Sequence, residues 1–197
     1  MSAENRFINE LLELSNILIL KGHPKLIIAG QLAYYDVLTK LPNRALLADR
    51  LQQAVARSHR NKTQLAICFL DLDGFKPVND NFGHEVGDQI LIKVAERITQ
   101  NIREIDTVSR QGGDEFVILL NDIESEEQCA HTLERIHQSL SQPQLIDGVE
   151  HLLTASSGVT LYPGDQSEMS SLLRHADEAM YLAKKAGKNN YQFFIVE

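Results

Sequence analysis

The sequence contains little cysteine and no long hydrophobic run. Its two cysteines, Cys68 and Cys129, do not have the spacing of a metal site, and Cys68 stands within an apolar stretch. We therefore expect buried free thiols in a reducing, cytoplasmic environment. No apolar run approaches the ~18 residues that a transmembrane helix requires. The N-terminus also lacks the basic start and apolar core of a secretory signal. We expect a soluble chain that makes no contact with a membrane.

Basic residues are in the minority. The chain has 19 Lys and Arg against 27 Asp and Glu, which gives a formal net charge of −8. A general nucleic-acid or membrane-surface binder normally carries an excess of positive charge, so we expect no nucleic-acid partner. An anionic ligand would need a local lysine cluster or a metal ion. The length of 197 residues, 43% of them hydrophobic, allows one sizeable domain plus an extension.

Two common ion- and phosphate-binding motifs are missing. Asp71 and Asp73 begin a pattern like that of a calcium loop, but Phe75 replaces the third oxygen ligand and Lys76 replaces the required glycine. The Gly-Lys pair at 187–188 lacks the upstream glycine and the following Ser or Thr of a P-loop. A nucleotide bound to this chain would therefore be held by a metal ion, lysines and loop amides.

The most informative segment that is present reads Arg-Gln-Gly-Gly-Asp-Glu-Phe at 110–116. Gly112 and Gly113 can adopt positive φ and let a ligand approach the backbone closely. Asp114 and Glu115 offer the hard oxygen ligands that Mg²⁺ prefers. The segment predicts a tight hairpin with acids at its tip, and an acidic surface turn without function is the alternative.

The remaining pattern predicts an α/β protein in which helices alternate with strands. We expect helices at about 44–59, 84–101, 124–141 and 170–186, and strands at 64–70, on both sides of the hairpin, as a pair near 149–162, and at 191–196. The hairpin requires antiparallel pairing, so the sheet should be largely antiparallel. If the strand that ends at Asp71 lies beside the hairpin, Asp71 and Asp114 meet at one edge of the sheet.

The N-terminal segment has a heptad-like pattern. Phe7, Leu11, Leu14 and Leu18 follow alternating four- and three-residue steps, and a second helical stretch is expected at 26–35. One interpretation is an amphipathic helix that packs on its own domain. The other is a dimerising stalk that joins an upstream module to this one.

These segments together resemble the GGDEF family, the diguanylate cyclases. The resemblance covers about residues 31–197 and leaves 1–30 as a helical linker or stalk. It implies a palm-like nucleotidyl-cyclase fold with a largely antiparallel five-stranded central sheet flanked by helices. It also implies condensation of two GTP molecules into cyclic di-GMP with release of pyrophosphate. Each subunit of such an enzyme holds one GTP, so a homodimer with Mg²⁺ (or Mn²⁺) is the expected active species.

The resemblance also implies roles for the acidic residues. Asp71 and Asp114 match the metal-binding carboxylates of the family, and the Leu72 carbonyl is a further ligand. Glu115 is either a metal ligand or the base that helps to deprotonate the attacking ribose 3′-hydroxyl. The motif leaves these two roles open.

The positions implied to bind substrate fall into three groups: Asn79 and Asp88 for guanine, Phe75 and Lys76 in the loop under the phosphates, and Lys184 and Lys188 for the β- and γ-phosphates. The family often has Arg where this chain has Lys188. Lysine keeps the charge but loses the bidentate fork, which would weaken triphosphate binding somewhat. Taken singly, lysines near a helix C-terminus also favour the helix dipole without any ligand.

A further segment resembles the family's inhibitory product site. Arg103 and Asp106 form an Arg-x-x-Asp pattern shortly before the hairpin, and Arg135 is a candidate basic contact from the neighbouring domain. The resemblance implies inhibition by bound cyclic di-GMP. A simple ion pair at a helix end is the alternative for the motif. A non-catalytic module that binds GTP or cyclic di-GMP is the alternative for the whole domain.

Overall fold

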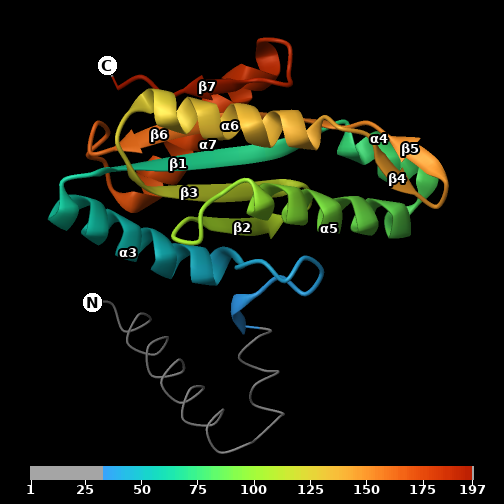
Figure 1. Cartoon of the computed structure of the whole chain (residues 1–197), viewed down its shortest axis with the longest axis horizontal. Helices are drawn as coiled ribbons and strands as arrows, with labels where there is room; N and C mark the ends of the chain where they lie inside the picture. Colours follow the sequence, from blue (N-terminus) through green and yellow to red (C-terminus); the bar gives the residue numbers. More distant parts are fainter. Residues whose placement is uncertain (1–32, 197) are drawn as a thin grey trace, which may run out of the picture.

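The computed structural model of the chain describes residues 33–196. The predicted linker or stalk at 1–30 lies outside these residues. The core is a five-stranded sheet in the order β2-β3-β1-β6-β7 (Figure 1). Its strands are β1 (Gln64–Asp73), β2 (Thr107–Gly112), β3 (Glu115–Ile123), β6 (Thr154–Tyr162) and β7 (Tyr191–Phe193). All neighbouring strands pair antiparallel except β6 and β7, which are parallel. The predicted five-stranded, largely antiparallel sheet is confirmed.

Helices cover both faces of this sheet (Figure 1). They are α3 (Arg44–Asn61), α4 (Phe75–Phe82), α5 (His84–Gln100), α6 (Glu126–Leu140) and α7 (Met169–Lys185). One apolar cluster joins the sheet to α5 and α6, and a second joins it to α3 and α7. Within residues 33–196, no helix is both long and apolar enough to cross a bilayer.

The central strand β1 contributes to both apolar clusters. Ala66, Cys68 and Leu70 face the cluster with α5 and α6, whereas Leu65 and Ile67 face the cluster with α3 and α7. Successive strand residues point to opposite faces, so a strand that is covered on both sides needs a continuous apolar run. The sequence pattern predicted this strand correctly. The two cysteines are buried free thiols, as expected.

Helix α3 begins directly after Asn43, which caps its first turn. The Asn43 side chain accepts hydrogen bonds from the backbone N–H groups of Ala45 and Leu46, at 2.9 and 3.1 Å. These bonds satisfy two donors that the first turn of a helix leaves free. The helix ends at Asn61, and the capping residue after it, Lys62, adopts a left-handed conformation with φ of 58°.

One helix was not predicted. The segment after β1 is α4 rather than a loop, so the expectation that Phe75 and Lys76 lie in a loop is wrong. Gly74, with φ of 80°, turns the chain directly into the helix. Pro77 lies in the first turn, where its missing N–H leaves no hydrogen bond unmade. Phe75 is buried in the core and holds the helix in place, whereas Lys76 is exposed.

The expectation that two strands near 149–162 pair with each other is also wrong. β5 (Val149–His151) pairs with β4 (Gln144–Ile146) in a separate two-stranded ribbon, and β6 joins the main sheet beside β1. Asp147 and Gly148 both have positive φ, as a two-residue hairpin turn requires. An Asp-Gly pair of this kind was the sequence signal for the ribbon. The closing strand β7 is shorter than predicted.

Candidate active site

The acidic residues meet at one edge of the sheet, where β1 ends beside the hairpin between β2 and β3. Asp71 of β1 lies opposite Glu115 of β3 in the antiparallel register. The Leu72 N–H faces the Asp114 carbonyl oxygen at 3.4 Å, so the hairpin tip continues the pairing to the end of β1. The strand order therefore brings Asp71 beside the acids of the hairpin, as the sequence predicted.

The hairpin tip is held by an arginine. The Nε and Nη2 groups of Arg110 donate to the Gly113 carbonyl at 3.0 and 2.7 Å, and its Nη1 group donates to both carboxylate oxygens of Asp36 at 3.0 Å. Gly112 and Gly113 have φ of 143° and 51°, and a Cβ atom at either position would meet nothing within 4 Å. The tip is thus fixed in position while its backbone remains open to a ligand.

Negative charge at this edge exceeds the positive charge that faces it. Lys184 Nζ contacts Asp71 Oδ1 at 2.8 Å. Burial nevertheless raises the pKa of Asp71, and repulsion from Asp114 adds to this effect while Lys184 opposes it. The pKa of Glu115 is also raised, first by burial and then by repulsion from Asp71, Asp177 and Asp114.

Hard oxygen donors with surplus negative charge are suited to a divalent cation. Within residues 33–196, no three His, Cys, Asp or Glu side chains already converge closely enough to enclose one. The Leu72 carbonyl, beside Asp71 at the strand end, is a further oxygen donor of the kind that Mg²⁺ accepts. The donor chemistry of Asp71, Leu72, Asp114 and Glu115 therefore fits a bound Mg²⁺ ion.

The two positions expected to bind guanine lie on neighbouring helices. Asn79 of α4 packs against Gly87 of α5 so closely that a Cβ atom on Gly87 would lie 1.9 Å from Asn79 Oδ1. That oxygen is buried and has no protein hydrogen-bond partner among the described residues. A buried acceptor without a partner is costly, so Asn79 is suited to a ligand that donates a hydrogen bond. Asp88, the residue after Gly87, is exposed.

The two lysines lie at and beyond the C-terminal end of α7. Lys184 belongs to the last turn of the helix, and Lys188 lies in the following loop with φ of 64°. The helix reaches this position because Gly158 of β6 has no side chain. A Cβ atom at 158 would lie 2.0 Å from both the Ala176 carbonyl oxygen and the Met180 nitrogen of α7. The sequence analysis did not identify Gly158 as the residue that lets α7 approach the sheet.

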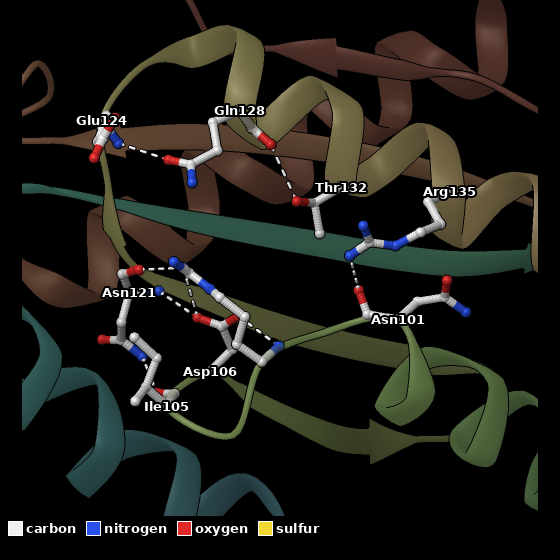
Figure 2. Close-up of polar contacts among 9 residues, drawn as sticks. Asn101, Ile105, Asp106, Asn121, Glu124, Gln128, Thr132 and Arg135 are labelled. Atoms are coloured by element: carbon white, nitrogen blue, oxygen red, sulfur yellow. Dashed lines mark hydrogen bonds and ion pairs between the residues drawn. The ribbon is translucent and has the colours of Figure 1, made fainter.

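A second polar cluster lies at the opposite end of β2 from the hairpin. Asp106, whose side chain is 1% exposed, accepts hydrogen bonds from the Arg103 guanidinium at 3.1 Å and from the Asn121 N–H at 2.8 Å. Figure 2 shows Asp106 beside Asn121, and Arg135 of α6 reaching the Asn101 carbonyl at 2.6 Å instead. The structure brings Arg103 and Asp106 together, whereas Arg135 is hydrogen-bonded elsewhere.

A cleft of about 800 Å³ adjoins this cluster. Arg103 and Asp106 form part of its wall, and Arg50, Arg57 and Arg60 of α3 form another part. The sequence analysis missed the three arginines of α3. Their spacing on a predicted helix was the available signal, but which element this helix faces depends on the fold.

The chain resembles known proteins over most of its length. Residues 33–190 match the family described as "Diguanylate cyclase, GGDEF domain". The bifunctional diguanylate cyclase/cyclic di-GMP phosphodiesterase MucR of Pseudomonas aeruginosa is 50% identical over 164 residues, which are 83% of this chain and 24% of MucR. The chain thus spans about a quarter of that relative.

Two solved structures support the same relationship. The GGDEF domain of TpbB (YfiN) of Pseudomonas aeruginosa is 37% identical with a TM-score of 0.80, and the match covers 82% of this chain and 95% of that one. The coiled coil and GGDEF domain of DgcB of Caulobacter crescentus, solved in complex with c-di-GMP, is 28% identical with a TM-score of 0.79 and coverage of 98% and 100%. The chain belongs to the GGDEF family of diguanylate cyclase domains.

Proposed function

We propose that this chain is a diguanylate cyclase that condenses two GTP molecules into cyclic di-GMP and releases pyrophosphate. The observation that carries the proposal is the sheet edge at which Asp71, Asp114 and Glu115 lie together with Lys184. Asn79 supports it, because its buried oxygen has no protein partner within the described residues. Binding of a nucleoside triphosphate requires acids that hold a metal ion, a cation that contacts the phosphates and an amide that contacts the base.

The acidic residues would hold Mg²⁺ (or Mn²⁺) and prepare the nucleophile. Asp71, the Leu72 carbonyl, Asp114 and Glu115 are the proposed ligands. The bound ion would supply positive charge for the α-phosphate and the leaving pyrophosphate. The raised pKa of Glu115 also suits a carboxylate that accepts the proton of the ribose 3′-hydroxyl. Glu115 thus has two proposed roles, as a metal ligand and as the base.

The remaining residues would bind and orient the substrate. Asn79 and Asp88 offer an amide and a carboxylate to the Watson–Crick edge of guanine. Lys184 would exchange Asp71 for the triphosphate, and Lys188 would contact the phosphates from the following loop. Phe75 and Lys76 would lie under the phosphates at the start of α4. Fixed positions of these groups would supply much of the rate acceleration.

One copy of the chain would provide half of the catalytic assembly. The 3′-hydroxyl of each GTP must attack the α-phosphate of the other GTP. Two domains, each holding one GTP, would therefore face each other as an antiparallel homodimer. The predicted helical segment at 1–30 would act as the stalk that brings two copies of domain 31–197 together. The expected cytoplasmic environment supplies GTP.

The cluster at the far end of β2 is the proposed product-inhibition site. About half of the Arg103 side chain remains exposed (44%) although it is paired with Asp106, so a phosphate could contact it. The arginines of α3 line the adjoining cleft. Arg135 would contribute only from a neighbouring domain. The c-di-GMP bound in the DgcB structure supports a product site in this fold.

The test incubates the protein over a range of concentrations with GTP and Mg²⁺ and separates the nucleotides by chromatography. We expect cyclic di-GMP to form at a rate that rises faster than linearly with protein concentration, because the active species is a dimer. Asp114→Ala should form none while it keeps the far-UV circular dichroism spectrum of the parent. GTP that stays intact, together with measurable binding of GTP or cyclic di-GMP, would identify a regulatory module instead.

A further inference from the structure

The Asp73 carboxylate joins three separate parts of the chain. Its Oδ2 atom accepts hydrogen bonds from Thr154 Oγ1 at 2.8 Å and from the Asn189 N–H at 3.0 Å. Its Oδ1 atom accepts from Ser156 Oγ at 2.8 Å. Thr154 and Ser156 belong to β6, and Asn189 belongs to the loop after α7. The last residue of β1 is thereby tied both to its neighbouring strand and to that loop.

The loop that Asp73 holds is the one that carries Lys188. Lys188 and Asn189 both adopt left-handed conformations, with φ of 64° and 47°. Two consecutive residues of this kind cost free energy, so the loop needs contacts that keep it in this shape. The Asn190 side chain provides one set, since it donates to the Ala183 and Lys188 carbonyls at 3.0 and 2.7 Å. The Lys188 N–H also donates to the Ala183 carbonyl at 3.2 Å, and the Ser157 N–H donates to the Asn190 carbonyl at 3.0 Å. Asp73 adds a side-chain acceptor for the Asn189 N–H.

We infer that Asp73 is a positioning residue that fixes the Lys188 loop for the triphosphate. This inference rests on the proposed function of Lys188. Asp73 does so through the amide next to Lys188, and the hydroxyls of Thr154 and Ser156 hold the carboxylate in place for that bond.

A role for Asp73 as a metal ligand fits these contacts less well. Both of its oxygen atoms already accept hydrogen bonds, and one of them accepts two. The Asp71 carboxylate, by contrast, is paired with a lysine, a cation that a metal ion could replace. Two aspartates on the same side of one strand thus have different tasks because β6 offers hydroxyls to only one of them.

Two substitutions at Asp73 separate positioning from charge. Asp73→Ala removes the acceptor, and we expect the KM for GTP to rise about tenfold with a smaller change in kcat. Asp73→Asn can keep an oxygen toward Thr154 and Asn189 and donate from its amide to Ser156, so it should restore the KM to within about twofold. A metal ligand would behave differently, since the amide would then be nearly as damaging as alanine.

A double-mutant cycle tests whether Asp73 acts through Lys188. Lys188→Ala alone should raise the KM, and adding Asp73→Ala should raise it no further. KM increases that multiply in the double variant would overturn the inference, as would a normal KM for Asp73→Ala. If Asp73→Ala does not fold, Thr154→Val replaces it, because it removes a donor to the same oxygen and should shift the KM in the same direction.

Hydrogen exchange supplies a readout that does not depend on turnover. The amide protons at 187–190 should exchange faster in Asp73→Ala than in the parent protein, because the Asn189 N–H loses its acceptor. Asp165→Ala is the matched control. That carboxylate also accepts from a threonine hydroxyl and a loop N–H, but it lies near the other end of α7. Unchanged exchange at 187–190 in Asp73→Ala would refute positioning even if the protein proved unable to use GTP.

Discussion

At the scale of single residues, the acidic edge gathers carboxylates whose burial costs stability. Asp71 and Glu115 lie opposite each other on two strands that are buried on both sides, and Lys184 supplies a positive charge beside Asp71. Burial is the largest cause that raises the pKa of both carboxyls, and repulsion from Asp114 adds to it in each case. Folding therefore makes these groups harder to ionise, and a bound cation would relieve this cost.

The sign of the Glu115 shift predicts how stability depends on pH. Below the usual value of 4.5 the carboxyl is protonated whether the chain is folded or unfolded, so Glu115→Gln should change little there. As the pH rises from about 4.5 through the raised pKa of the folded state, the ionised group increasingly destabilises the parent protein. Glu115→Gln should then unfold at a higher temperature than the parent at about pH 7, yet form no cyclic di-GMP.

Thermal unfolding at several pH values checks this prediction. The control is Glu96→Gln, which alters an exposed glutamate of α5 and should have the same unfolding temperature as the parent across the range. A Glu115→Gln protein that is less stable than the parent at neutral pH would contradict the expected sign.

At the scale of elements, the hairpin between β2 and β3 is attached to the segment that precedes α3. Arg110 of β2 spans from Asp36 to the Gly113 carbonyl, and the pair is mostly shielded, with 12% and 21% of the two side chains exposed. Burial acts to raise the pKa of Asp36. The hydrogen bonds from Thr39 and Arg110 outweigh it and leave that pKa below its usual value.

Arg110→Ala should lower the free energy of unfolding by about 2 kcal/mol, because it leaves a half-buried carboxylate with fewer partners. Activity should fall as well, since the hairpin tip loses its anchor. The stabilisation from Asp36 is present above its usual pKa of 3.8 and is lost as the pH falls through the lower folded value, so the effect of Arg110→Ala should shrink in acid.

Urea titrations measure this difference. Arg174→Ala is the control, because it breaks an ion pair with Glu178 in which both side chains are about half exposed. Such a pair should contribute less than about 0.5 kcal/mol. If the two arginine variants lost equal free energies of unfolding, the ion pair between Arg110 and Asp36 would contribute no more than an exposed pair.

At the scale of the whole molecule, the acidic edge and the proposed inhibitory site lie at opposite ends of β2. Five steps along that strand amount to about 17 Å. Arg103 and Asp106 therefore do not touch the acidic edge, and product bound there would act on the arrangement of two domains rather than on the carboxylates.

Arg103→Ala should raise the concentration of cyclic di-GMP that halves the rate by about tenfold or more, while the initial rate stays near that of the parent. Arg103→Lys should fall between the two, because lysine keeps the charge but not the fork. Initial rates with added cyclic di-GMP check this. Asp106 is buried, so the assay must run well below the unfolding temperature of each variant. Unchanged inhibition in Arg103→Ala would remove the proposed site.

The chemistry-bearing segments were predictable because their signals are local. The Gly-Gly pair predicts a turn, the acids follow it directly, and the apolar run before Asp71 favours a strand that is covered on both faces. The helix α4 was missed for the opposite reason. Its residues include Pro77 and Asn79, which are poor helix formers, and it is stabilised by burial of Phe75 against residues far away in sequence.

The sequence by itself determined where the carboxylates, amides and lysines lie along the chain, because donor chemistry belongs to the side chains themselves. Only the tertiary structure decided what each of them contacts. Asp71 and Asp73 are two residues apart on one strand, yet one faces Lys184 and the other faces β6 and the loop at Asn189. The physical reason is that these partners are more than 80 positions away, and sheet order alone brings them together.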